Sequence, residues 1–153
     1  ESVLAEVRAV LVPTPGALEL VRRARAAGWV TALVSGGFHE VIDELAAEAG
    51  IDHVHANRFE IAGGRFTGKV HGEIVDGGVK RRTLEELARR HGVPAARTIA
   101  MGDGANDREM LAAAGTGIAF RAKPALREMA DVVLDGPSLL DAWPHLEAAA
   151  RAR

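Results

Sequence analysis

Residues 98–107 read TIAMGDGAND, an apolar stretch that runs into a loop of glycines and carboxylates. Thr98 to Met101 predict a buried strand, and helical spacing of apolar residues resumes at Asp107. Glycines let the backbone turn tightly between the two elements, and Asp103 and Asp107 place carboxylates beside the N–H groups that open a helix. Magnesium usually takes one or two protein carboxylates together with water and phosphate oxygens. The stretch therefore predicts a strand, a magnesium-binding loop and a helix.

The same loop has a plainer interpretation, in which Asn106 or Asp107 caps the helix and the glycines only turn the chain. Two other loop motifs are excluded. A calcium-binding EF-hand loop would need an oxygen-bearing residue at Ala105 and a glycine at Arg108, and a dinucleotide-binding loop would need a third glycine at Asp107.

Strands and helices alternate on both sides of this stretch. This alternation predicts an α/β fold, a three-layer doubly wound parallel sheet with helices on both faces. Short alternating segments flank Gly63-Gly64 and predict a small β-hairpin within residues 51–77. The predicted helices cover residues 2–11, 17–27, 39–49, 79–91, 107–114, 124–129 and 138–150, and the predicted strands outside the hairpin cover 29–34, 98–101, 117–120 and 131–134.

A second polar loop, Ser35-Gly36-Gly37, lies between a predicted strand and a predicted helix. In parallel sheets, ligands collect where strands end and helices begin, so the hydroxyl and backbone amides of this loop would hold a phosphate. The alternative is a simple connection in which Ser35 caps the helix. A serine hydrolase is disfavoured because Leu33 stands where the nucleophile motif needs glycine.

Three cations, Lys80 to Arg82, open a predicted helix, which is the unfavourable end for positive charge. An anion nearby would offset this cost, and a lysine beside a phosphoryl group would stabilise its charge. The alternative is a solvated basic turn. His53 and His55 share one face of a predicted strand, but the sequence indicates no third metal ligand for them.

The composition narrows the class of protein. The chain has 153 residues, of which 48% are hydrophobic, enough for a globular core. The net charge of −2 offers no basic surface for nucleic acid, and no apolar stretch is long enough for a membrane span. The chain has no cysteine, which excludes disulfides and fits a reducing compartment. We expect a soluble cytoplasmic protein with neither nucleic-acid nor membrane partners.

Five motifs together resemble phosphoserine phosphatases of the haloacid dehalogenase-like superfamily, in order and in rough spacing. The resemblance spans roughly residues 15–135. The motifs are Val34-Ser35-Gly36-Gly37-Phe38, Ala56-Asn57 with its hairpin to Thr67-Gly68, Asp76 with Lys80, Gly102-Asp103-Gly104-Ala105-Asn106-Asp107, and Gly117-Ile118-Ala119-Phe120 followed by Ala122-Lys123-Pro124.

The resemblance implies a magnesium-dependent enzyme that hydrolyses O-phospho-L-serine to serine and phosphate, in serine biosynthesis. An aspartate would attack phosphorus and form an aspartyl-phosphate, which water then hydrolyses. Homodimers are also known in the family. The implied roles are phosphate binding for Ser35, Gly36, Lys80 and Asn106, catalysis for Lys80 and Ser35, direct ligation of magnesium for Asp103, and orientation of the metal's ligand shell for Asp107.

One part of the family pattern is missing. The Asp-x-Asp motif that supplies the nucleophile should precede Ser35, and the first aspartate of this chain is Asp43. Because the chain begins with Glu1, we expect a C-terminal part of a longer phosphatase, inactive alone. Its residues 1–153 would form one incomplete core, with 1–12 as the remnant of a helical cap and 51–77 as a small β insertion.

Two further functions stay open at this point. The protein could hydrolyse another small phosphomonoester, because the cap that selects the substrate is not part of this sequence. It could also be a truncated, non-catalytic module that binds phosphate-bearing ligands or a partner protein. Arg121, which precedes Ala122-Lys123-Pro124, departs from the family pattern and has no assigned role.

Overall fold

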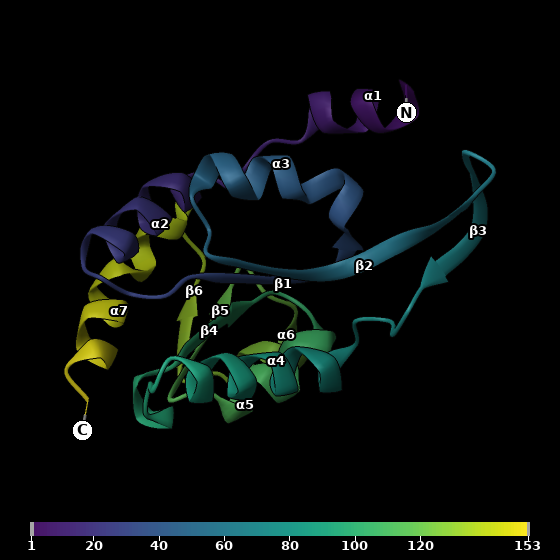
Figure 1. Cartoon of the computed structure of the whole chain (residues 1–153). Coiled ribbons are helices and arrows are strands. Elements are labelled where there is room, and N and C mark those ends of the chain that lie inside the picture. The colour runs from purple at the N-terminus through teal and green to yellow at the C-terminus, as the bar shows by residue number, and fades with distance from the viewer. Residues whose placement is uncertain (1, 153) are drawn as a thin grey trace. The chain divides into compact units, whose positions relative to one another are not determined.

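The computed structural model describes residues 2–152, and helices and strands alternate along them as predicted (Figure 1). Glu1 and Arg153 lie outside the described residues. Glu1 begins both the predicted cap remnant, 1–12, and the predicted core, 1–153, and Arg153 ends that core. No helix within residues 2–152 is long and apolar enough to cross a membrane. The helices are α1 (Ser2–Val10), α2 (Ala17–Ala26), α3 (His39–Ala49), α4 (Gly77–Arg90), α5 (Arg108–Ala113), α6 (Pro124–Arg127) and α7 (Trp143–Ala150), and the strands are β1 (Ala32–Phe38), β2 (His53–Ala62), β3 (Arg65–His71), β4 (Ile99–Gly102), β5 (Thr116–Phe120) and β6 (Val132–Leu134).

The chain forms two compact units. The first contains the segment up to Pro13 and Val21–Val75, and the second contains Thr14–Leu20 and the chain from Asp76 onward. Each unit has its own three-stranded sheet, ordered β1-β2-β3 in the first and β4-β5-β6 in the second. The α/β class with parallel strands is confirmed, and the strands are divided between two sheets.

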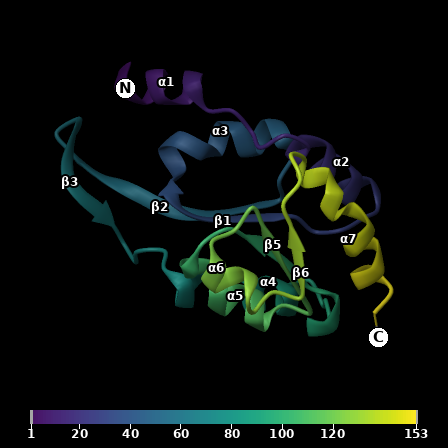
Figure 2. The same cartoon turned by 180° about the vertical axis from the view of Figure 1, so that it is seen from behind.

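In the first unit, β2 pairs parallel with β1 and antiparallel with β3. The turn between β2 and β3 contains Gly63 and Gly64, with φ of 60° and 77°. Two successive positive φ angles suit a tight hairpin turn and favour glycine there, so the predicted hairpin is confirmed. Helix α3 runs along the β1–β2 pair in both views (Figures 1 and 2), and the Arg8 Nε of α1 donates to the carbonyl of Glu40 at 2.7 Å.

The prediction for β1 was wrong in its boundaries and its burial. The predicted strand covered residues 29–34 and ended before the Ser35 loop, but the observed strand starts at Ala32 and runs through that loop to Phe38. Its side chains are half-buried or exposed, because β1 is the edge strand of its sheet and has a partner on one side only. The ladder begins where Ala32 faces His53.

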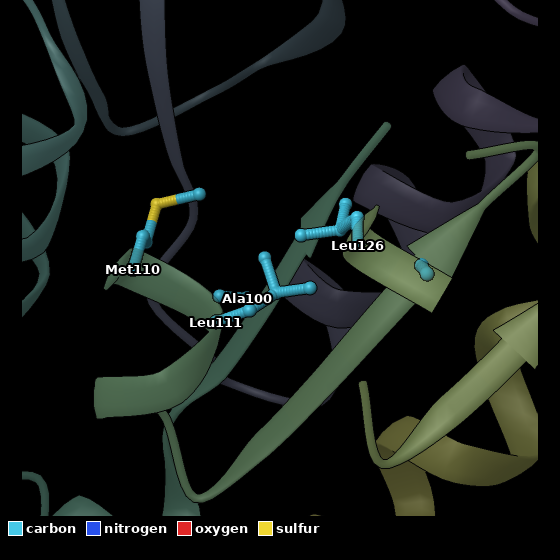
Figure 3. Close-up of a cluster of buried hydrophobic side chains, with 5 residues drawn as sticks. Ala100, Met110, Leu111 and Leu126 are labelled. Atoms are coloured by element: carbon cyan, nitrogen blue, oxygen red, sulfur yellow. The ribbon is translucent and has the colours of Figure 1, made fainter. Parts of the chain in front are cut away.

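In the second unit, β4, β5 and β6 are all parallel, so Gly102 and Ala119 are partners near the carboxyl ends of β4 and β5. Helices α4 and α5 lie side by side (Figures 1 and 2). The core of this unit places two residues of α5 and one of α6 around the strands (Figure 3). Its buried residues are Ala100, Met110, Leu111, Ala119 and Leu126.

Candidate functional site

A buried ion pair joins α4 to the loop that follows β4. The Nζ of Lys80 donates to Oδ1 of Asp107 at 2.7 Å, and the two residues are 6% and 5% exposed. A charged side chain is stable at such burial only with a partner, and each charge here neutralises the other. Asp107 is thus an anion that offsets the cost of placing the Lys80 cation at the start of α4. The alternative of a solvated basic turn is wrong for Lys80, which is buried. It holds for Arg81, which is exposed and pairs with Glu85.

The second oxygen of Asp107 shapes the loop. Oδ2 accepts from the backbone N–H of Asp103 at 3.1 Å and of Gly104 at 3.3 Å. A Cβ on Gly102 would lie 2.4–2.5 Å from the Asp107 side chain, so only glycine fits at that position. The capping interpretation is wrong for α5, because its N-cap Asp107 makes no side-chain bond to that helix. The carboxylate of Asp107 instead reaches back to the N–H of Gly104, at the start of the 3-10 turn Ala105–Asp107, and it also holds Lys80.

The carboxylate of Asp103 is exposed, in contrast to that of Asp107. The main chain of Asp103 is held in place because its carbonyl accepts from the N–H of Lys123 at 3.0 Å. Its oxygen chemistry fits magnesium. Within residues 2–152 no group of three acidic or histidine side chains is placed to hold a metal. Asn106 lies exposed in the same loop.

The Ser35 loop is a bulge in the β1–β2 ladder. Val34 pairs with His55 and Phe38 with Asn57, so three residues of β1 face Ala56 alone. The Oγ of Ser35 accepts from the N–H of Gly37 at 2.9 Å, which leaves the hydroxyl hydrogen to be donated to an anion. The N-cap of α3 is Phe38, so the alternative in which Ser35 caps the helix is wrong.

The side chains of His39 and Asn57 stabilise this bulge through hydrogen bonds. The Nε2 of His39 accepts from the N–H of Ala56 at 3.2 Å, and its Nδ1 lies 2.7 Å from Asp43. The Nδ2 of Asn57 donates to the carbonyl of Gly36 at 2.9 Å, and its Oδ1 accepts from the N–H of Val75 at 2.8 Å.

Neither residue was among the predicted site residues. Asn57 belongs to one of the five motifs without an assigned role, and His39 belongs to none of them. A polar amide inside a strand next to Ala56 is the sequence signal that could have pointed to Asn57, because a buried amide needs partners.

The predicted residues thus fall into two groups. Lys80, Asp103, Asn106 and Asp107 belong to the second unit, and the contacts of Asp107 bring Lys80 and the backbone of Asp103 together. Ser35 and Gly36 belong to the first unit. His53 and His55 lie on β2 and join no group of three ligands among the described residues.

Comparison with known proteins agrees with this geometry. The profile of the haloacid dehalogenase-like hydrolase family matches residues 1–112. A curated phosphoserine phosphatase from Streptomyces coelicolor is 49% identical over 138 residues, which are 90% of this chain and 34% of that protein. The chain spans between about a third and two thirds of the length of the first curated relatives that it matches.

Solved structures agree as well. A phosphoserine phosphatase structure described as a phospho-aspartyl intermediate analogue has a TM-score of 0.83 at 38% identity, covering 88% of this chain and 65% of that one. A substrate-bound phosphoserine phosphatase complex has a TM-score of 0.84 at 38% identity, covering 88% and 64%. The predicted resemblance is confirmed: the chain belongs to the haloacid dehalogenase-like hydrolase family, and these relatives within it are phosphoserine phosphatases.

Proposed function

We propose that this chain supplies the phosphate-holding and metal-holding part of a phosphoserine phosphatase. The observation that carries the proposal is the buried Lys80–Asp107 pair, which shapes the loop bearing Asp103. A buried ion pair is weak as a device for stability, so its presence beside an exposed carboxylate favours a functional role. Relatives with 38–49% identity over most of this chain are phosphoserine phosphatases, one of them solved with substrate bound.

Each predicted site residue has a role in this proposal. The hydroxyl of Ser35 and the amide of Gly36 donate to phosphate oxygens. Lys80, of whose three N–H groups Asp107 accepts one, offers the others to a phosphoryl group. Asn106 contacts phosphate, Asp103 ligates magnesium, and Asp107 orients that ligation through its hydrogen bonds to the loop. Magnesium, when bound, neutralises phosphate charge.

The nucleophile is not supplied by this chain. Its first aspartate is Asp43, which lies in α3 and pairs with His39. One relative was solved as a phospho-aspartyl intermediate analogue, which supports an aspartate as the nucleophile. We therefore propose that residues 1–153 form the incomplete core of a longer phosphatase, with 1–12 from its cap and 51–77 as its insertion, and that they do not turn over substrate alone.

The test is an assay of phosphate release. The product of the complete gene is expected to release phosphate from O-phospho-L-serine, with magnesium and faster than from phosphothreonine or a sugar phosphate, and residues 1–153 alone are expected to release none. Lys80→Met in the complete product is expected to lower kcat by at least about a hundredfold. Equal turnover of all substrates would reject the phosphoserine assignment, and turnover by the isolated chain would reject the need for an external nucleophile.

The remaining parts of the proposal concern location and assembly. We propose a cytoplasmic protein, supported by the absence of cysteine from the sequence.

A homodimer is proposed only from the family resemblance. Sedimentation equilibrium of the complete gene product, with a mass of twice the monomer expected, tests it.

A further inference from the structure

We infer that Asn57 is the positioning residue for the phosphate loop, which is defined here as Ser35–Gly37. This inference rests on the proposed function, in which that loop binds phosphate. Asn57 is 6% exposed and lies on β2 next to the strand that carries the loop. Both ends of its side chain are bonded to backbone groups, at 2.9 Å and 2.8 Å.

The first step of the argument is the bulge. Where three residues of β1 face Ala56 alone, the regular ladder cannot supply a partner for every backbone group. Gly36 itself is exposed, but Asn57 is 6% exposed, and a buried amide left without a partner costs free energy. The amide of Asn57 bonds the carbonyl of Gly36 at this place, so a side chain replaces the missing ladder bond and fixes the shape of the loop.

The second step follows from the planarity of the peptide bond. The carbonyl of Gly36 and the N–H of Gly37 belong to one trans peptide, so they point in opposite directions. The carbonyl bonds Asn57 and the N–H bonds the Oγ of Ser35 at 2.9 Å. Holding one end of this peptide therefore sets the other, and Asn57 determines where the Ser35 hydroxyl lies.

The third step concerns the residue type. The donor must face a carbonyl and the acceptor must face the N–H of Val75, which requires one of each on a short planar group. Aspartate at position 57 has the same shape, but it would bring a carboxylate oxygen against the Gly36 carbonyl. Leucine at this position would leave both backbone groups unpaired.

The experiment measures phosphate binding at the loop itself. The 153-residue chain, labelled with 15N, is titrated with inorganic phosphate in the presence of magnesium, and the amide shifts of Gly36 and Gly37 give the Kd. In Asn57→Asp this Kd is expected to rise about tenfold or more. Thr98→Val is the matched control, because Thr98 is also buried and bonds the backbone of Ala95 and Gly115 through its hydroxyl. It is expected to leave the Kd unchanged.

A pH series separates positioning from loss of folding. A buried carboxyl takes up a proton more readily than an exposed one, and the protonated group at position 57 can donate to the Gly36 carbonyl as the amide does. The ratio of the Kd of Asn57→Asp to that of the unsubstituted chain is expected to fall towards one between pH 7 and pH 5. If Asn57→Asp does not fold at pH 7, Asn57→Ser, which leaves room for a bridging water, takes its place in the titration.

Each outcome has a distinct meaning. If the unsubstituted chain shows no phosphate-dependent shift at Gly36 or Gly37, the proposed role of Ser35 and Gly36 in phosphate binding is overturned, and this inference with it. Folded Asn57→Asp or Asn57→Ser that binds phosphate as tightly as the unsubstituted chain overturns this inference alone. The same holds if Thr98→Val weakens binding equally, because the effect would then follow from lost stability anywhere in the chain.

Discussion

At the scale of single residues, Gly102 shows how closely the loop fits the buried carboxylate. A Cβ there would lie 2.4–2.5 Å from Asp107, so Gly102→Ala must displace the side chain that holds Lys80. We expect a loss of about 1 to 3 kcal/mol in the free energy of unfolding, measured by urea denaturation. The control is Gly78→Ala in α4, where a Cβ meets only ordinary contacts of 3.5 Å or more and helix propensity favours alanine. Equal losses in both variants would contradict the prediction.

The Lys80–Asp107 pair calls for a double-mutant cycle. Removing either partner leaves a charge buried without its counterpart, so Lys80→Met and Asp107→Asn are each expected to cost about 3 to 5 kcal/mol of unfolding free energy. The double variant should cost less than the sum, with a coupling of roughly 1 to 3 kcal/mol. Glu85→Gln, which breaks the exposed pair with Arg81, should cost under about 0.5 kcal/mol. Additive losses at Lys80 and Asp107 would show that the pair contributes nothing.

Arg121 has a positive φ of 46°, the one such value among the non-glycine residues of 2–152. Its N–H donates to the carbonyl of Leu134 at 2.8 Å, which holds the backbone there. Asparagine tolerates this left-handed conformation better than arginine does. Arg121→Asn is therefore expected to raise the Tm by about 2 to 4 °C. Arg121→Ala is the control, because alanine tolerates a positive φ no better than arginine does. An equal rise in its Tm would show that the gain comes from removing the arginine side chain and not from the backbone conformation.

At the scale of elements, Asp52 ties the chain ahead of β1 to the start of β2. The hydrogen bond from the N–H of Thr31 is the main cause that lowers the pKa of Asp52 below 3.8, and the Thr31 hydroxyl contributes as well. A carboxyl with a lowered pKa in the folded state stabilises that state above the pKa of the unfolded chain, and it loses this effect as the pH falls through the lower, folded value.

The expected result is a difference that depends on pH. Asp52→Asn should lower the free energy of unfolding at pH 7 by less than about 1 kcal/mol, because the group is largely exposed. The difference from the unsubstituted chain should shrink as the pH falls below 3.8. Urea denaturation at pH 7, 5 and 3 measures it. A difference that stays constant across this range would show that the charge of Asp52 has no part in it.

At the scale of the whole molecule, sequence periodicity was enough to predict the order of helices and strands and the parallel pairing. The loops after the apolar strands also pointed to Asp103 and Ser35, because strand ends and glycines are local features. The pairing of Lys80 with Asp107 was not predictable from periodicity, since 27 residues separate them. The course of β1 through Ser35–Gly37 could not be predicted, because a bulge is defined by the pairing with β2 and the sequence of β1 alone does not determine that pairing.

The bulge in β1 makes the number of residues between Val34 and Phe38 as important as their identity. Three residues of β1 stand against one of β2, so deleting two of the three would restore a regular ladder and remove the loop. Successive side chains of a strand point to opposite faces. Deleting only one of the three residues would therefore turn Phe38 away from Phe59, whose ring it stacks on with 3.8 Å between the ring centroids. Insertions and deletions should accordingly be tolerated far less between Val34 and His39 than at the Gly63-Gly64 turn, which is open to solvent.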